Sequence, residues 1–321
     1  VGLLALAVAG MAGPVEKQFF PGSDRTEVLI SIYLPQGSAI TATDATARKV
    51  EALLHDIEGV RSQSAYIGAG APRFFVSANP EQPDPAFAKV IAVAEDEAAR
   101  DHIIEVLEGH IAAGEFPEAR VRVARLLYGP PVIWPIEFRV LGADPMVLRE
   151  LGRRVREIIA RHPHVVDPHL EWNERAPIAF LAMDHERLRL IGLTPREVAE
   201  QLEFQSQGIA VTGIRQDIRN LELRVRGLDD GSPVDPMAME LITADGRKVS
   251  LAQLGEVEIR FEEPVIWRWN REPFLGVQAD IRGAQPKDVT VELWADLAAF
   301  RDDLPRGYSI DIGGSVEESG K

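Results

Sequence analysis

The chain has 321 residues and an acidic composition, with 35 lysines and arginines against 50 aspartates and glutamates and a formal net charge of −15. This surplus of negative charge repels phosphate groups and argues against nucleic acid as a partner. Cysteine is absent, which excludes disulfides, thiol nucleophiles and cysteine-type zinc sites.

Residues 1–13, VGLLALAVAGMAG, are apolar or small and carry no charge. As a helix they would rise about 20 Å, which is less than the roughly 30 Å hydrocarbon core of a bilayer. A signal peptide would show a positively charged leading region, which is missing. We therefore expect the outer end of a truncated membrane-spanning helix, with a buried core helix as the alternative.

One pattern then recurs four times: an extended strand, an amphipathic helix, a tight turn and a second strand. In the first copy, apolar residues alternate along the strand with the period of a half-buried strand. These apolar residues are Val28, Ile30, Ile32 and Leu34. A helix is expected over about 41–57, and a strand returns after Gly59. The second copy has a strand at 88–93, a helix near 97–113 and a strand at 119–127.

The third copy begins with a strand at 136–140, and Asp144 is expected to cap the following helix with Pro145 at its first position. Pro163 stops that helix before a strand at 165–172. The fourth copy takes a strand at 274–281, a helix and a strand at 307–314. Its helix is predicted from apolar residues in register at Leu293, Leu297, Phe300 and Leu304.

Two strand–helix–strand units packed side by side make a ferredoxin-like sandwich, in which helices cover one sheet face. The four units therefore predict an α+β fold with two such subdomains. The second is split by an insert of different character, at about 184–262. In the insert we expect two short helices, with Thr194-Pro195 as cap and first turn, and a hairpin turning at Asp245-Gly246.

Three motifs contain residue types found in chemical sites, but local structure explains each of them better. His162, His164 and His169 cluster near a helix end, but their spacing suits no standard zinc pattern. Residues 184–186, Asp-His-Glu, fit a helix cap better than a catalytic trio, because adjacent residues point in different directions. The segment Gly68-Ala69-Gly70 lacks the following residues of a phosphate loop. We therefore expect no catalytic residue, no metal and no cofactor.

Four segments carry a resemblance to a known family. They are VEKQFFPGSDRTEVLISIYLPQG at 15–37, MDHERLRLIGLTPREVAEQL at 183–202, DGRKVSLAQLGEVEIRFEEPVIWRWNREP at 245–273 and LPRGYSIDIGGSVEESGK at 304–321. In this order they resemble the second periplasmic loop of resistance-nodulation-division (RND) efflux transporters of the AcrB/MexB-like type. The first periplasmic loop of that family has the same architecture, so it stays an alternative.

The resemblance implies two porter subdomains, at 14–131 and at 132–183 plus 263–321, with 184–262 as a docking subdomain. It implies no enzyme, but the periplasmic part of a proton-driven antiporter in a Gram-negative inner membrane, which exports small amphiphilic substrates. The implied partners are a periplasmic adaptor protein and an outer-membrane channel, and the implied assembly is a homotrimer. The proton-relay residues of the family lie in membrane helices outside this chain.

The resemblance also implies a substrate-binding surface. The helices should cover the Val28/Ile30/Ile32 face of the first strand, and the family's deep drug pocket lies against the opposite face. The matching residues are Glu27, Leu29, Tyr66, Ile67, Phe74, Phe75 and Phe87. If residues 73–77, RFFVS, form a strand, Phe74 points to the core and Phe75 to the pocket. The alternative is that these are ordinary core aromatics.

Two readings from other classes remain open. One is a soluble ligand-binding or catalytic protein built on tandem ferredoxin-like folds, which would show a small-ligand site with convergent polar groups. The other is a lipid- or protein-exporting relative of the same superfamily, for which a longer apolar tunnel is expected.

Overall fold

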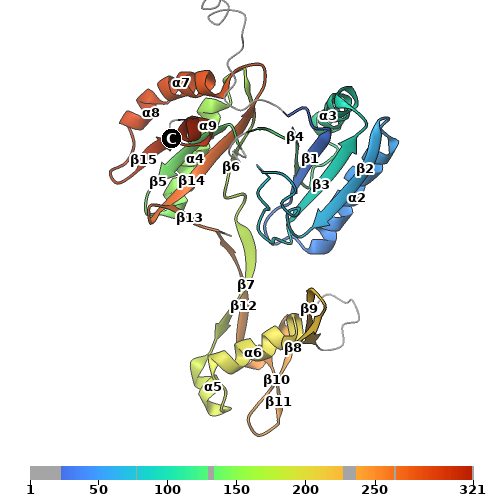
Figure 1. The fold of residues 1–321 in the computed structure, drawn as a ribbon. Helices are drawn as coiled ribbons and strands as arrows, with labels where there is room; N and C mark the ends of the chain where they lie inside the picture. The colour runs from blue at the N-terminus through green and yellow to red at the C-terminus, as the bar shows by residue number, and fades with distance from the viewer. Residues whose placement is uncertain (1–22, 77, 129–133, 227–235, 264, 320–321) are drawn as a thin grey trace, which may run out of the picture. The chain divides into compact units, whose positions relative to one another are not determined.

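The computed structural model describes residues 23–76, 78–128, 134–226, 236–263 and 265–319 (Figure 1). The chain divides into two compact units, Val1–Ala176 with Glu263–Lys321, and Pro177–Glu262. The expected membrane-helix end at 1–13 lies outside the described residues. Within them, no helix has both the length and the apolar character that crossing a bilayer requires.

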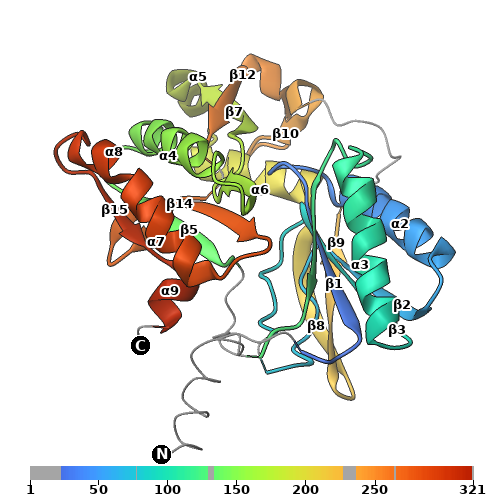
Figure 2. The same cartoon turned by 90° about the horizontal axis from the view of Figure 1, so that it is seen from above.

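The first half of the larger unit is an antiparallel sheet in the order β2-β3-β1-β4, with two helices on one face (Figure 2). The strands are β1 (Glu27–Tyr33), β2 (Val60–Ile67), β3 (Phe87–Ala94) and β4 (Arg120–Arg125), and the helices are α2 (Ile40–Asp56) and α3 (Glu97–Ala112). Val28, Ile30 and Ile32 are fully buried and pack in one cluster with residues of both helices. The predicted alternation is therefore confirmed.

The second half of this unit is a five-stranded sheet in the order β13-β14-β5-β15, with β6 also paired to β14. The strands are β5 (Ile136–Leu141), β6 (Val165–Leu170), β13 (Trp267–Trp269), β14 (Glu272–Ile281) and β15 (Ser309–Ile312). The helices are α4 (Pro145–Ile159), α7 (Pro286–Asp296), α8 (Ala298–Asp302) and α9 (Gly314–Ser319). Asp144 caps α4 as predicted, because its carboxylate accepts hydrogen bonds from the N–H groups of Met146 and Val147.

The single helix expected in the fourth copy is wrong, because the chain breaks at Leu297 into α7 and α8. The apolar register is nonetheless correct: Leu293, Leu297 and Phe300 are all buried in the core of the second sheet. The break at Leu297 therefore leaves these apolar side chains in the core.

In its described residues, the smaller unit, Pro177–Glu262, contains three strand pairs, two α-helices and the short 3-10 helices Pro236–Ala238 and Leu251–Gln253. The pairs are β7 (Ala176–Met183) with β12 (Gly255–Glu262), β8 (Ile209–Gln216) with β9 (Arg219–Val225), and β10 (Glu240–Ile242) with β11 (Lys248–Ser250); the helices are α5 (His185–Leu190) and α6 (Pro195–Ser206). Thr194 and Glu197 form a capping box at the start of α6. The compact unit starts at Pro177, whereas the predicted insert starts at residue 184. The difference is strand β7, which pairs with β12 at the end of the unit.

Candidate functional site

The face of the first sheet that α2 and α3 do not cover, here called the open face, carries a mixture of aromatic and charged side chains. Strand register places Tyr66, Lys89, Ser31 and Arg122 in one row across the four strands. The next row contains Phe87, Tyr33 and Arg120. The rings of Tyr33 and Phe87 are 5.1 Å apart. Each row therefore combines aromatic and charged side chains.

The structure brings some of the predicted site residues together on this face. By strand alternation and register, Leu29, Tyr66 and Phe87 share it. Glu27 lies at its end and binds Arg25, whose hydrogen bond lowers the pKa of the Glu27 carboxyl. Ile67, in contrast, pairs with Ala88 on the helix-covered side and packs against the core cluster there.

The strand considered for residues 73–77 does not form in its described part, residues 73–76, which lie in the loop that joins β2 to β3. Phe74 is 40% exposed and Val76 is 77% exposed, so neither belongs to the core. Phe75 instead contacts Tyr128, with ring centroids 5.9 Å apart, and lies under the guanidinium of Arg25. The physical reason is the loop's four prolines, at 72, 80, 83 and 85, which lack the N–H that a strand ladder needs.

This loop is attached to the open face through a buried lysine. Lys89 donates a hydrogen bond of 2.8 Å to Ser31 Oγ and forms an ion pair of 2.6 Å with Glu81 of the loop. Burial lowers the pKa of Lys89, and the charge of Glu81 opposes that effect. The loop therefore supplies the carboxylate that pairs with the charge of Lys89 on the open face.

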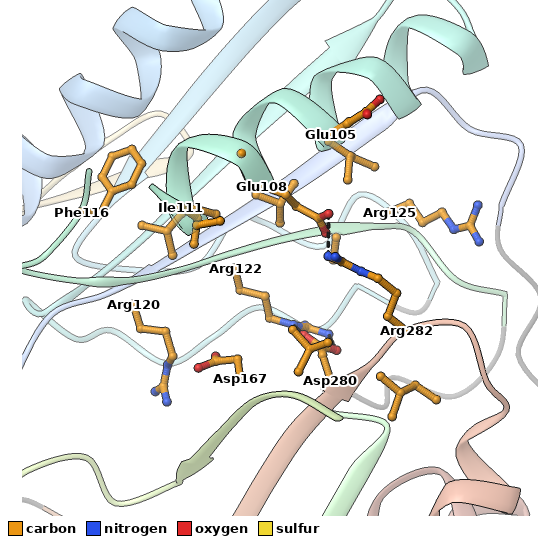
Figure 3. Close-up of a pocket in the computed structure, with 18 of the residues that line it drawn as sticks. Glu105, Glu108, Ile111, Phe116, Arg120, Arg122, Arg125, Asp167, Asp280 and Arg282 are labelled. Carbon is orange, nitrogen blue, oxygen red and sulfur yellow. Dashed lines mark hydrogen bonds and ion pairs between the residues drawn. The ribbon is translucent and has the colours of Figure 1, made fainter. Parts of the chain in front are cut away.

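A cavity of about 1250 Å³ lies beside β4, and its walls come from both halves of the larger unit (Figure 3). One wall is the outer surface of α3, and the opposite wall is formed by residues near β6 and the end of β14. The apolar lining residues include Ile104, Ile111, Phe116, Val121 and Ile281. Among its lining residues are none of the seven predicted ones.

Two ion pairs join the walls of this cavity. Arg122 donates two hydrogen bonds to the carboxylate of Asp280, at 2.6 and 2.8 Å, and its guanidinium lies 4.3 Å from the ring centroid of Trp134. Arg282 donates to Glu108 at 2.7 Å, and Figure 3 shows this pair spanning the cavity. Burial is the largest influence and disfavours the charge of Arg122. The hydrogen bond and charge of Asp280, with smaller contributions from Tyr33 and Asp167, together outweigh burial, so the pKa of Arg122 is raised.

Of the three histidines considered as a metal site, His162 and His164 contact each other, with ring centroids 5.8 Å apart. His162 Nε2 lies 2.9 Å from Glu292, and His164 Nδ1 lies 2.8 Å from the carbonyl oxygen of Arg282. His169 is buried against Trp134, and burial lowers its pKa to about 3. In the part of the chain that the structure describes, no group of three or more acidic or histidine side chains could hold a metal ion.

Sequence reasoning missed the charged residues of this region, above all Lys89, Arg120, Arg122 and Asp280. A signal for two of them is present: in ARVRVARLL, Arg120 and Arg122 are separated by one residue and therefore share a strand face. Their partners come from other parts of the chain, so the alternation alone could not identify the pairs.

The described residues thus form two helix-covered sheets of strand–helix–strand repeats, with an α+β unit inserted into the second. The model of the AcrB/AcrD/AcrF family matches residues 1–321, and the chain belongs to this family of efflux transporters. No curated protein matches the sequence significantly.

The fold is also found in two crystal structures of a heavy metal efflux pump. Crystal form I matches with a TM-score of 0.75 and 16% identity, over 99% of this chain and 35% of that one. Crystal form II matches with a TM-score of 0.73 and 16% identity, over 99% of this chain and 34% of that one. The chain thus spans about a third of the length of the pumps it matches, and at this identity the likeness concerns the fold alone.

Proposed function

We propose that the chain is the periplasmic substrate-binding and channel-docking part of a proton-driven RND efflux transporter that exports small amphiphilic compounds. The observation that carries the proposal is the pairing of two amphipathic surfaces in a member of the family. One is the open face with Leu29, Tyr66 and Phe87; the other is the cavity beside β4. Both offer apolar area together with charged groups, the chemistry that amphiphilic molecules require.

Substrate contact is proposed for all seven residues derived from the resemblance: Glu27, Leu29, Tyr66, Ile67, Phe74, Phe75 and Phe87. Leu29, Tyr66 and Phe87 have the strongest support, because they share one face. For Ile67 and Phe74 the support is weaker, since the first packs against the core cluster and the second lies in a loop. The cavity adds Arg122 and Asp280 as charged groups beside an apolar wall.

The test uses the full-length transporter in a bacterial strain without pumps of its own. Leu29→Ala shortens a side chain on the open face, and Leu53→Ala makes the same deletion on α2, where Leu53 packs against the core cluster. Leu29→Ala should change susceptibility to some amphiphilic dyes or detergents, whereas Leu53→Ala should leave it unchanged at equal expression. If the two variants behave alike, the open face does not contact substrate.

The proposed partners are a periplasmic adaptor and an outer-membrane channel, and the proposed assembly is a homotrimer. Support comes from the exposed apolar side chains of the β8–β9 hairpin, an arrangement typical of interaction surfaces. These are Ile209, Val211, Ile214, Leu221, Leu223 and Val225. Replacing Pro177–Glu262 by a short Gly/Ser linker should abolish efflux while the purified transporter still binds a dye. Retained efflux would contradict the docking role.

Metal ions are a second candidate substrate class, because both matched structures are of a heavy metal efflux pump. The same susceptibility panel distinguishes the two classes when it includes metal salts. Protection against metal salts and not against dyes or detergents would replace amphiphilic compounds by metal ions as the cargo.

A further inference from the structure

The second sheet also has a face without helices α4 and α7, and it is polar. On β5, Ile136, Phe138 and Val140 are fully buried in the core, so Glu137 and Arg139 point to the other side. Gln278 on β14 faces Glu137 and donates a hydrogen bond of 3.1 Å to its Oε1. Most of this polar surface is covered, since Arg139 and Gln278 are each only 8% exposed.

Two carboxyl groups converge on this face over Gly276. Glu171 Oε2 lies 2.6 Å from the position that a Cβ on residue 276 would take, and Glu137 Oε1 lies 3.3 Å from the same point. A larger residue would force at least one carboxyl away, so glycine is needed for the two to approach. The backbone holds Glu171 in place, because its N–H donates to the carbonyl of Gly276 at 2.8 Å.

The two carboxyl groups differ in how they are satisfied. Glu137 Oε2 accepts hydrogen bonds from Arg139 Nη2 and from the N–H of Gly314, each at 3.2 Å, while its Oε1 accepts the bond from Gln278. Glu171 Oε2 is buried and has no hydrogen-bond partner among the residues that the structure describes. Burial, and then the charge of Glu137, raise the pKa of Glu171 to about 7.

The same groups hold α9 against the sheet. Arg139 Nη2 donates to Glu317 of α9 at 2.6 Å, and Glu137 accepts from the first residue of the helix, Gly314. Ser315, which is buried, donates its backbone N–H to Pro135 at 3.3 Å. The position of α9 therefore depends on where the charges of Glu137 and Arg139 are directed.

We propose that Glu171 holds a proton beside the Glu137 carboxylate and that this proton controls how firmly α9 docks on the second sheet. With the proton bound, Glu171 is a neutral acid whose O–H faces the Glu137 carboxylate, and Arg139 stays with Glu317. Without it, two buried carboxylates face each other and both compete for Arg139. Arg139 is then drawn from Glu317, and the contact that holds α9 weakens.

Other charged groups face this pair from the surrounding elements. His169 lies on the same face of β6, and because its pKa is lowered to about 3 it stays neutral across the neutral range. Asp311 of β15 stands opposite Arg139 in register, and Asp280 of β14 is bound to Arg122. Arg139 itself stacks on Trp269 at 4.1 Å, which limits the directions in which its guanidinium can move.

The experiment is a pH titration of the whole chain followed by NMR. The carboxyl carbon of Glu171 should titrate near pH 7, and the amide protons of Gly314 and Ser315 should lose about ten-fold in protection from exchange across the same pH range, after correction for intrinsic exchange. Titration of Glu171 in the ordinary range of a glutamate would overturn the proposal, and so would protection of α9 that does not change with the state of Glu171.

Two variants separate this device from a general effect of pH. Glu171→Gln keeps the neutral form at every pH, so α9 should stay protected throughout. Glu174→Gln removes a nearby exposed carboxyl and should preserve the loss of protection near pH 7. The proposal fails if Glu171→Gln leaves that loss unaltered or if Glu174→Gln removes it.

Discussion

The largest effect on stability is expected for a buried ion pair between Arg149 of α4 and Glu263, where the chain re-enters the larger unit. Arg149 is 2% exposed, and the Glu263 side chain is 8% exposed. Arg149 Nε donates to Glu263 Oε1 at 3.0 Å, its Nη2 pairs with Oε2, and its Nη1 donates to the carbonyl of Asn173 at 2.7 Å. Glu263→Ala removes two of these bonds and leaves the guanidinium buried with one neutral partner.

An uncompensated buried charge of this kind costs about 3–5 kcal/mol. Arg175, whose Nε lies 3.7 Å from Glu263 Oε1, adds to the cost, because two cations then lie close together without their shared carboxylate. The double variant Arg149→Met, Glu263→Met should lose far less, since both charges leave together and the methionines fill the space. The double variant should thus be much more stable than the summed free-energy costs of the two single substitutions would give.

The assay is urea unfolding of the whole chain, followed by near-ultraviolet circular dichroism. Two compact units permit two transitions, so each variant's effect is assigned to the transition of the larger unit. Glu174→Ala, which removes an exposed glutamate nearby, is the matched control and should change the free energy of unfolding by under about 0.5 kcal/mol. A cost below about 1 kcal/mol for Glu263→Ala would refute the reasoning that Arg149 depends on this partner.

Three further predictions use the same free-energy measurements. The pKa of Glu171 is raised to about 7 in the folded chain from an ordinary 4.5, so the folded state binds this proton more tightly. The stability that this proton contributes is full below pH 4.5 and falls by about 3 kcal/mol as the pH rises through 7. Glu171→Gln should flatten this fall. Phe74→Ala should cost under about 1 kcal/mol, since Phe74 is largely exposed, whereas Phe75→Ala should cost more because it loses Tyr128 and Arg25; the reverse order would restore the strand prediction. Thr194→Ala should cost the smaller unit about 1 kcal/mol by removing its capping box, and no change would show that the cap is redundant.

The sequence by itself determined the repeated strand–helix–strand order, the apolar faces and the caps. These follow from local rules: a period of two for strands, helical spacing for α4, and the short-range bonds of Asp144 and Thr194 to nearby N–H groups. Such features need no knowledge of which segments meet. They can therefore be predicted without knowing any partner strand, and the family resemblance rests on the same local segments.

Only the tertiary structure decided which polar side chains meet. Glu137, Glu171 and Gly276 come from three distant segments, and they converge because β6 and β5 both pair with β14. Arg122 of β4 and Asp280 of β14 also come from distant segments, and they meet across two sheets. Phe74 and Phe75 lie in a loop and not in a strand, because the prolines of this segment lack the N–H groups that a strand ladder needs. Periodicity assigns a side chain to a face, but strand pairing and register, which depend on burying both apolar faces at once, decide its neighbours.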